Sequence, residues 1–383
     1  MKFRDVFILS LILGLSVFVG GFTKIGKQIK AKLMPPIEVV SISEVKGELR
    51  DFFLEDDHLE GLVNRWYDRL SLEAQVGQLI MPALDATLND DALKLLIESE
   101  TVGGFMVLTK DFSEASLKAL EEANPNQVPL LVSVDAEPSL LKYRFTDPVY
   151  EKETADLKTA ERITEVSRLI ATELKRFGMN LNFAPVYDLS TNTTVIGTRA
   201  FSGTPAEVQS RANLMSQTFM SENVIPTAKH FPGHGLVAGD THLELQTITE
   251  PLTELPQFKA AINDQIPVVM VGHLAVKNDT YDTEGLPATL SPLMMQDLLR
   301  NEMGFEGVII TDAMNMQAVS AFENADLLSL LAGADIVLMP ADAGQLNRDI
   351  QTLLMAEPVF QAEIEAKIKR VLRLKLVWRL SQY

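Results

Sequence analysis

Eight short apolar runs recur along the chain, and their spacing constrains the fold more than any other feature of the sequence. The runs are Val76–Ala83, Val102–Leu108, Val128–Val134, Asn180–Val186, Val224–Ala228, Ile266–Val271, Gly307–Thr311 and Ala334–Met339. Most are followed by a stretch with helical periodicity, such as Ala160–Phe177, Pro205–Asn223 and Pro292–Met303. Continuous apolar runs are typical of parallel strands that are buried on both faces. The pattern therefore predicts an α/β fold built from strand–helix units.

Eight such units predict a single (β/α)8 TIM-type barrel. We expect three parts: a signal peptide or membrane anchor over 1–34, a linker and leading helix over 35–70, and the barrel domain over 71–383. An open, doubly wound sheet is the alternative. The strand count and the lack of a glycine fingerprint for a dinucleotide after the first strand argue against it. Val359–Gln382 predicts an amphipathic terminal helix packed on the barrel.

Residues 6–22 form an apolar stretch behind Lys2 and Arg4. Such a hydrophobic segment is typical of a secretory signal or an uncleaved anchor, and it is marginally long enough to span a bilayer. We therefore expect residues 6–22 to tether the protein to a membrane. The expected location is the cell envelope, either membrane-anchored or periplasmic. Four lysines follow the stretch, so the positive-inside rule offers an alternative at the cytoplasmic face of the inner membrane.

The charge of the chain argues against nucleic acid as a partner. The net charge is −18, and six Lys or Arg against one Asp give residues 1–34 a net +5. The remaining residues therefore carry −23. A body this acidic would repel a phosphate backbone, which needs clustered cations. The chain has no cysteine, which excludes a lipoprotein anchor.

The segment Lys229-His230-Phe231-Pro232-Gly233-His234-Gly235, followed by Asp240-Thr241-His242, concentrates the titratable groups of the chain. Three of its five histidines fall within these positions. Glycine permits backbone conformations that other residues resist, and proline ends a helix. We therefore expect an ordered loop, which is where catalytic residues tend to lie.

Polar residues follow most of the predicted strands, where a barrel places its chemistry. These residues are Asp135 and Glu137, Asp188 and Arg199, Lys229 with its loop, His273, Asp312 and Asp342. Because the carboxyl ends of parallel strands share one face, we expect them to converge on one mouth.

Asp312 and His242 are the strongest candidates for catalysis. Asp312 ends the run Gly307–Thr311, where a rigidly held carboxylate suits a covalent nucleophile; a helix N-cap is the structural alternative. His242 lies two residues after Asp240, and a carboxylate near an imidazole favours an acid/base group that works near neutral pH.

The remaining candidates favour ligand binding over metal chemistry. Pro232-Gly233 between His230 and His234 rules out a metal pair on a helix, and zinc needs three or four converging ligands. We expect no metal and no other cofactor. Lys229 suits hydrogen bonding to polar ligand groups better than a Schiff base. Arg199 suits either ligand binding or an ion pair that braces its loop, and Asp188 and His273 suit structural roles.

The sequence KHFPGHGLVAGDTH resembles the signature of β-N-acetylhexosaminidases in glycoside hydrolase family 3. It matches their pattern KH(F/S)PG(H/L)G, four residues, then D(S/T)H at every specified place. GQLIMPA, NLNFAPVYDL, VIGTRAF, LPATLSP and GFEGVIITDAMNM follow in the family's order, over about residues 70–375. The resemblance implies a single (β/α)8 barrel without a second sandwich domain.

The resemblance also implies roles for individual residues. Asp312 resembles the nucleophile, His242 the acid/base and Asp240 its dyad partner. The residues that resemble those holding the sugar are Asp135, Arg199, Lys229 and His230. Relatives commonly read DQEGGR where this chain has Asp135-Ala136-Glu137-Pro138-Ser139-Leu140. The arginine at the sixth place is missing, and we expect Arg144 to substitute for it.

The resemblance implies a retaining glycoside hydrolase that removes terminal β-linked N-acetylglucosamine from peptidoglycan fragments, through a covalent intermediate on Asp312. The expected partners are N-acetylglucosamine-containing cell-wall saccharides, and a monomer is expected. Three alternatives remain. The first is an N-acetylglucosaminide phosphorylase, in which phosphate resolves the intermediate, the second is a catalytically inactive glycan-binding protein of the envelope, and the third is a metal-dependent hydrolase.

Overall fold

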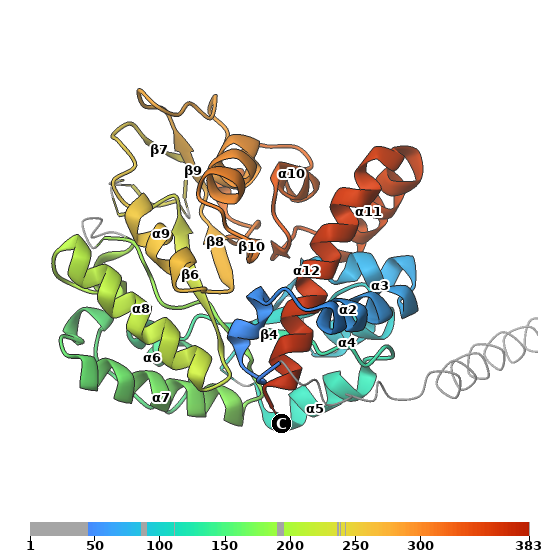
Figure 1. Cartoon of the computed structure of the whole chain (residues 1–383), viewed down its shortest axis with the longest axis horizontal. Helices are drawn as coiled ribbons and strands as arrows, with labels where there is room; N and C mark the ends of the chain where they lie inside the picture. Colours follow the sequence, from blue (N-terminus) through green and yellow to red (C-terminus); the bar gives the residue numbers. More distant parts are fainter. Residues whose placement is uncertain are drawn as a thin grey trace, which may run out of the picture. The chain divides into compact units, whose positions relative to one another are not determined.

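In this computed structural model, strands and helices alternate along the chain, and the helices lie around a parallel sheet (Figure 1). The residues that the structure describes are 45–85, 90–110, 112–189, 195–235, 237, 239–241 and 243–382. They lie within one unit, Glu44–Tyr383. The predicted signal or anchor over 1–34, including residues 6–22, lies outside them. No helix among the described residues is long and apolar enough to cross a membrane.

The strands are short and fully parallel where they pair. The first six are β1 (Ile80–Met81), β2 (Ala83–Leu84), β3 (Gly104–Val107), β4 (Leu131–Val134), β5 (Leu181–Asn182) and β6 (Ile225–Phe231). The others are β7 (Gln246–Ile248), β8 (Val268–Val271), β9 (Leu274–Val276), β10 (Val308–Thr311) and β11 (Val337–Leu338). A seven-stranded sheet has the order β10-β8-β6-β5-β4-β3-β2, and β1-β11 and β7-β9 form two separate pairs.

The prediction of a closed (β/α)8 barrel is wrong: the described residues form this seven-stranded parallel sheet with helices, and no ladder of eight strands closes. The prediction of an α/β fold with buried parallel strands holds. Between β10 and the segment that leads into β11 the described residues have one isolated bridge, Ile310–Ile336, and a few backbone hydrogen bonds, such as the Thr311 N–H to the Ile336 carbonyl at 3.1 Å. The physical reason lies partly in Pro82, which separates β1 from β2. Proline has no N–H for a ladder, and the chain changes partner there, from β11 to β3.

Helices cover the sheet, with their apolar faces inward. Before β6 these are α2 (Asp57–Arg69), α3 (Leu72–Gly77), α4 (Asp90–Glu98), α5 (Glu114–Ala123), α6 (Leu141–Arg144), α7 (Ala160–Arg176) and α8 (Pro205–Ser221). After it come α9 (Leu255–Asn263), a π-helix over Leu293–Glu302, α10 (Ala325–Ala332), α11 (Ala343–Ala356) and α12 (Gln361–Leu380). Short 3-10 turns are Leu49–Phe53, Pro138–Leu140, Thr154–Asp156, Gly197–Arg199, Ala288–Leu290, Gln317–Val319 and Pro358–Phe360.

Local sequence explains where these helices begin. In α8, Thr204 and Glu207 form a reciprocal capping box, and Pro205 occupies the first turn, where its missing N–H costs nothing. Thr159 caps α7 by accepting the N–H of Arg162. The predicted helices over Ala160–Phe177 and Pro205–Asn223 are confirmed within two residues.

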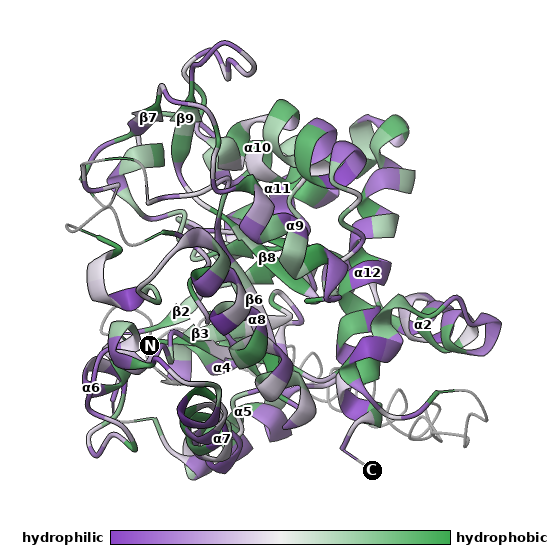
Figure 2. Cartoon of the chain, turned by 60° about the vertical axis from the view of Figure 1, so that its left-hand side comes forward, coloured by the Kyte–Doolittle hydropathy of each residue, from purple (hydrophilic) through white to green (hydrophobic). Residues whose placement is uncertain are grey.

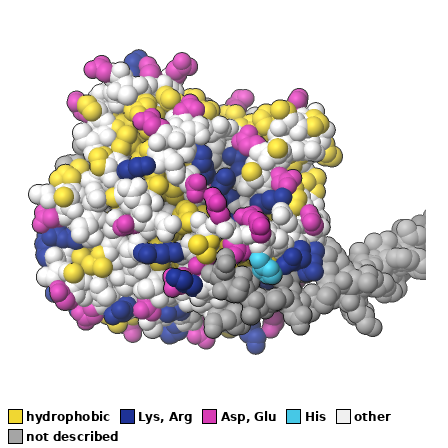
Figure 3. Space-filling view, viewed as in Figure 1, with side chains coloured by type: hydrophobic (Ala, Val, Ile, Leu, Met, Phe, Trp, Pro, Cys, Tyr) yellow, Lys and Arg dark blue, Asp and Glu magenta, His cyan; other side chains and the backbone are white. Residues whose placement is uncertain are grey.

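The colouring by hydropathy in Figure 2 shows the apolar strand β8 inside a layer of mixed helices. The terminal helix α12 packs on α2, which confirms the predicted packing of Val359–Gln382 (Figure 1). It buries one unusual cation: Lys375 is 1% exposed, and its Nζ donates to Gln78 Oε1 at 2.5 Å and to the Gly103 carbonyl at 2.6 Å. On the face shown in Figure 3, acidic and basic side chains are interspersed.

Candidate active site

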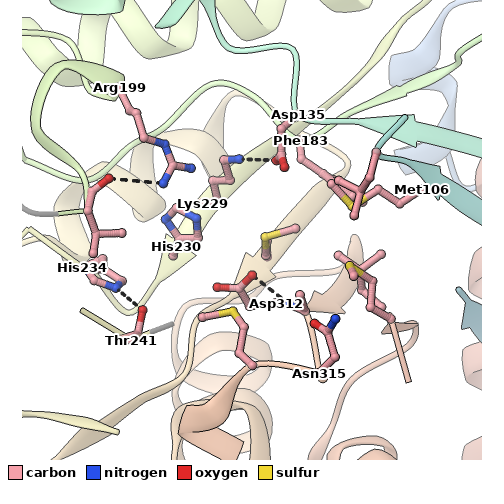
Figure 4. A pocket seen from close by; sticks show the side chains of 17 residues that line it. Met106, Asp135, Phe183, Arg199, Lys229, His230, His234, Thr241, Asp312 and Asn315 are labelled. Carbon is pink, nitrogen blue, oxygen red and sulfur yellow. Dashed lines mark hydrogen bonds and ion pairs between the residues drawn. The ribbon is translucent and has the colours of Figure 1, made fainter. Parts of the chain in front are cut away.

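One cavity of about 230 Å³ lies at the carboxyl ends of the central strands (Figure 4). Its polar lining comprises Asp135, Arg199, Lys229, His230, His234, Thr241, Asp312 and Asn315. Its apolar lining comprises Met106, Leu108, Phe183, Val195, Met270, Ala313, Met316, Leu338 and Met339. Five residues singled out in the sequence therefore meet in one place, although almost 180 positions separate Asp135 from Asp312. The volume is close to the lower end of small-molecule sites, roughly 300 Å³, and suits one sugar ring.

Asp312 follows β10 directly, and β10 aims it into the cavity. Its backbone N–H donates to the Val271 carbonyl at 2.8 Å, which ties the residue to β8. One carboxylate oxygen accepts the N–H of Ala313 at 2.8 Å. Asp312 is not a helix N-cap: the next turn, Gln317–Val319, begins after Met316. Burial opposes ionisation, but the charges of His230 and His273 outweigh it and lower the pKa of Asp312.

Asp135 and Lys229 form an ion pair on the opposite wall. Asp135 follows β4, and its carboxylate lies 2.8 Å from the ammonium of Lys229, which is 1% exposed and belongs to β6. Burial alone would raise the pKa of Asp135, but Lys229 and Arg144 hold it well below its usual range. Both groups are thus charged and can bind hydroxyl groups.

Glu137 pairs with two cations that line the cavity, Lys229 and Arg199, although it does not line the cavity itself. It lies 2.6 Å from Lys229 Nζ, and Arg199 donates to both of its carboxylate oxygens, at 2.7 and 2.9 Å. Burial opposes ionisation of Glu137, but Arg199 and Lys229 lower its pKa. Arg199 lines the cavity and also forms an ion pair, so both interpretations of this residue apply.

His230 is oriented by Asp188. The carboxylate of Asp188 accepts the His230 N–H at 3.1 Å and contacts the ring Nδ1 at 2.7 Å. It also accepts the His234 N–H at 2.8 Å. Burial opposes ionisation of Asp188, but His230 lowers its pKa. Asp188 is completely buried and acts through the residues that it holds.

The loop after β6 returns to the same cavity. His234 Nε2 lies 2.8 Å from the hydroxyl of Thr241, and both side chains line the cavity (Figure 4). Asp240 precedes Thr241, and its carbonyl accepts the N–H groups of Leu243 and Glu244. Asp240 is not among the described side chains that line the cavity. His242 lies outside the described residues.

A buried carboxylate braces the start of this loop. Glu254 accepts the N–H of Gly235 at 3.0 Å and the N–H of Leu189. Burial and the nearby charge of Asp188 raise the pKa of Glu254 to about 8, against the effect of the two amides. The raised pKa favours the neutral form of Glu254, which limits the negative charge buried beside Asp188.

Arg144 lies beside the cavity rather than in it. Its guanidinium is 3.1 Å from Asp135, and the side chain lines a neighbouring cavity with Lys110, Phe145 and Arg176. Arg144 therefore contacts the site only through Asp135 among the described side chains.

Two further strand-end residues are structural. His273 contacts the hydroxyl of Thr289 at 2.8 Å and the carbonyl of Ala313 at 2.9 Å, so it supports the turn after Asp312. Asp342 caps α11 by accepting the N–H of Gln345 at 2.8 Å. The position of Asp342 after β11 predicted a residue at the mouth of the site, but its carboxylate instead caps the N-terminus of α11.

Some residues of the site could not be found from sequence. The thioether lining of Met106, Met270, Met316 and Met339 is one case, because a methionine in an apolar run predicts only core packing. Glu137 and Asp188 carried a signal, since each follows a strand. Among the described residues, no group of three or more His, Cys, Asp or Glu side chains could hold a metal ion.

Residues 71–374 match the N-terminal domain of glycosyl hydrolase family 3. The chain belongs to this family. The resemblance predicted from KHFPGHGLVAGDTH is thereby confirmed.

The chain is similar to proteins that are named as hexosaminidases or N-acetylglucosaminidases. A β-hexosaminidase A from Pseudoalteromonas piscicida is 27% identical over 326 residues, covering 74% of this chain and 54% of the relative. A β-N-acetylglucosaminidase structure from Paenibacillus sp. FPU-7 has a TM-score of 0.72 at 31% identity, covering 81% of this chain and 63% of that one. A β-N-acetylhexosaminidase structure from Beutenbergia cavernae has a TM-score of 0.69 at 28% identity, covering 80% and 98%. The chain thus spans about half of the first relative and nearly all of the third.

Proposed function

We propose that this family 3 protein is a β-N-acetylhexosaminidase that removes terminal β-linked N-acetylglucosamine with retention of configuration. One observation carries the proposal: the Asp312 carboxylate faces Asp135, Arg199, Lys229 and His230 across a cavity of about 230 Å³. A single carboxylate opposite a wall of hydrogen-bonding groups suits a sugar ring held over a nucleophile. The names of the relatives support N-acetylhexosamine as that sugar.

Asp312 is the nucleophile of this proposal. Its lowered pKa keeps the carboxylate ionised, as attack on the anomeric carbon requires. The new bond from Asp312 to that carbon forms as the bond to the leaving oxygen breaks, and the electron pair of the broken bond goes to that oxygen. Water then attacks the glycosyl ester, which frees the carboxylate.

His242, paired with Asp240, supplies the proton in this scheme. The imidazolium gives its proton to the leaving oxygen and later takes one from the attacking water. Two observations support this role: Thr241, its neighbour in sequence, lines the cavity, and Asp240 precedes it. An imidazole also avoids placing a second carboxylate beside Asp312.

The substrate class in this proposal is fragments of peptidoglycan. The small cavity supports recognition of one terminal sugar and leaves the remainder of the fragment outside. Hydrolysis of a purified disaccharide of N-acetylglucosamine and N-acetylmuramic acid, compared with chitobiose, tests this substrate class.

Turnover of nitrophenyl N-acetylglucosaminide, glucoside and xyloside by the purified protein tests the activity. We expect the first to be cleaved and Asp312→Asn to lower kcat by about 1,000-fold or more while the protein stays folded. Asp342→Asn is the control, because that strand-end aspartate caps α11 and should leave kcat unchanged. Lack of cleavage of all three glycosides contradicts the proposal and favours a glycan-binding protein.

Phosphate and non-phosphate buffers separate hydrolysis from the phosphorylase alternative. A hydrolase releases free N-acetylglucosamine in both buffers. Formation of N-acetylglucosamine 1-phosphate in phosphate buffer, with slow turnover in its absence, would show that phosphate resolves the intermediate.

A further inference from the structure

Five charged side chains of alternating sign form one continuous row at the ends of β4 and β6. The order is Arg144, Asp135, Lys229, Glu137, Arg199, and the distances between neighbours are 3.1, 2.8, 2.6 and 2.7 Å. Asp135, Lys229 and Arg199 line the cavity. The row places two cations of the site on either side of Glu137.

Glu137 itself is withdrawn from the cavity. It is 1% exposed and is not among the described side chains that line the cavity. Its Oε1 lies within hydrogen-bond distance of Lys229 and Arg199, and its Oε2 accepts from Arg199 Nε. The carboxylate therefore engages both cations and has no surface to offer a sugar.

Arg199 depends on this contact for its place. It ends the short turn Gly197–Arg199, which belongs to a loop rather than to the sheet. A further hydrogen bond of its guanidinium, to the Val195 carbonyl at 3.3 Å, stays within that loop. The bidentate pair with Glu137 is the contact that ties the guanidinium to the residues after β4. A planar fork held by two parallel bonds has one orientation.

We infer that Glu137 is a positioning residue for sugar recognition, which holds Arg199 and Lys229 at one fixed spacing across the cavity from Asp312. The inference rests on the proposed function. Glu137 also balances charge: the row has three cations and two carboxylates. Without Glu137 its net charge increases from +1 to +2.

Glu137→Gln tests the inference, with nitrophenyl N-acetylglucosaminide as substrate and N-acetylglucosamine as ligand. We expect KM and the Kd for N-acetylglucosamine to rise about 10- to 100-fold, as for loss of charge-assisted hydrogen bonds, while kcat changes less. The acid limb of the kcat/KM profile should move to lower pH, because the added positive charge favours ionised Asp312.

Asp335→Asn is the matched control. Asp335 is also completely buried between two arginines, Arg300 and Arg370, but it does not line the cavity. Both variants lose a buried carboxylate between two cations, so both should lower Tm. Only Glu137→Gln should raise KM. Equal effects of the two variants on KM, or none for Glu137→Gln, would overturn the inference.

A double-mutant cycle separates positioning from a general loss of order. If Glu137 acts through Arg199, Glu137→Gln should cost much less in an Arg199→Lys background than in the wild type. Full additivity of the two changes overturns the inference. If Glu137→Gln does not fold, Glu137→Asp is the alternative variant, since it keeps the negative charge but has a shorter side chain. Unchanged KM and Kd in Glu137→Asp would also overturn the inference.

The Kd distinguishes failure of this inference from failure of the proposed function. A wild-type protein that binds N-acetylglucosamine without cleaving the glycoside contradicts the proposed function, yet the role of Glu137 is still measured by Kd.

Discussion

Asp188 holds His230 by two contacts to one carboxylate, 3.1 Å to its backbone N–H and 2.7 Å to its ring Nδ1. The ring contact favours a proton on Nδ1 and fixes the orientation of the imidazole. The orientation of a cavity residue is thus decided by a side chain that does not line the cavity.

Replacing Asp188 tests that relationship. In Asp188→Asn the tautomer of His230 is no longer set by a carboxylate, and the buried N–H groups of His230 and His234 compete for one carbonyl oxygen. We expect a rise of about 10-fold or more in KM and a loss of about 1–3 kcal/mol in stability. Nitrogen chemical shifts of the His230 ring check the tautomer; an unchanged ring spectrum contradicts the prediction.

Lys229 should be essential for stability as well as for binding. Lys229→Met leaves Asp135 and Glu137 buried without the cation between them, which should cost about 3–5 kcal/mol in the free energy of unfolding. Lys367→Met is the control, because Lys367 is also buried but pairs with Glu363 along α12. Denaturant titration of both variants gives the comparison. Equal losses would mean that burial of any lysine, rather than this ion pair, is what matters.

The same ion pair predicts how acid affects stability. The pKa values of Asp135 and Glu137 are lower in the folded protein than in the unfolded chain. Their stabilising contribution is therefore complete above the unfolded values, near 4, and is lost as pH falls through the lower folded values. We expect a free energy of unfolding that falls steeply below about pH 4. In Lys229→Met the fall should be smaller, because the folded pKa values are no longer held as far below the unfolded ones.

Lys375 predicts a second rise in stability with pH, above about pH 7. Burial lowers its pKa to about 7, from 10.5 in the unfolded chain. Between these values the unfolded chain binds a proton that the folded protein does not, so this group makes stability rise with pH. Lys375→Met should remove that rise. Urea unfolding at about pH 6 and about pH 9 measures it, and an identical slope in the variant would show that Lys375 stays charged.

Gly235 is predicted to tolerate no side chain. A Cβ at this position would overlap the Leu189 carbonyl and the carboxylate of Glu254. Gly235→Ala should displace the loop that carries Thr241 and lower kcat/KM by about 10-fold or more. Gly344→Ala is the control, since its Cβ would make ordinary contacts only. Wild-type activity in Gly235→Ala would show that the loop start can shift without effect.

The sequence predicted the alternation of elements well, because buried strands and amphipathic helices leave strong local patterns. It did not predict how the sheet is divided. The sequence pattern indicates one apolar run over Val76–Ala83, but its first residues end α3 and its later ones contribute to two strands on either side of Pro82. Whether short strands join in one ladder depends on hydrogen bonds between distant segments, which local pattern does not encode.

The same limit applies to the site. Residue type and position after a strand were enough to select Asp135, Lys229, His230 and Asp312. They could not show that Glu137 lies between Lys229 and Arg199, or that Arg144 faces a neighbouring cavity. The role of a charged side chain depends on its ion-pair partners, and these come from other segments of the chain.

The amino-acid sequence by itself determined the class of fold, the family and the chemical groups available, because periodicity and motif are local properties. Only the tertiary structure decided which charges neutralise one another and which side chains reach the cavity. The physical reason is that Coulomb energy and burial depend on distances between residues that are far apart in the chain.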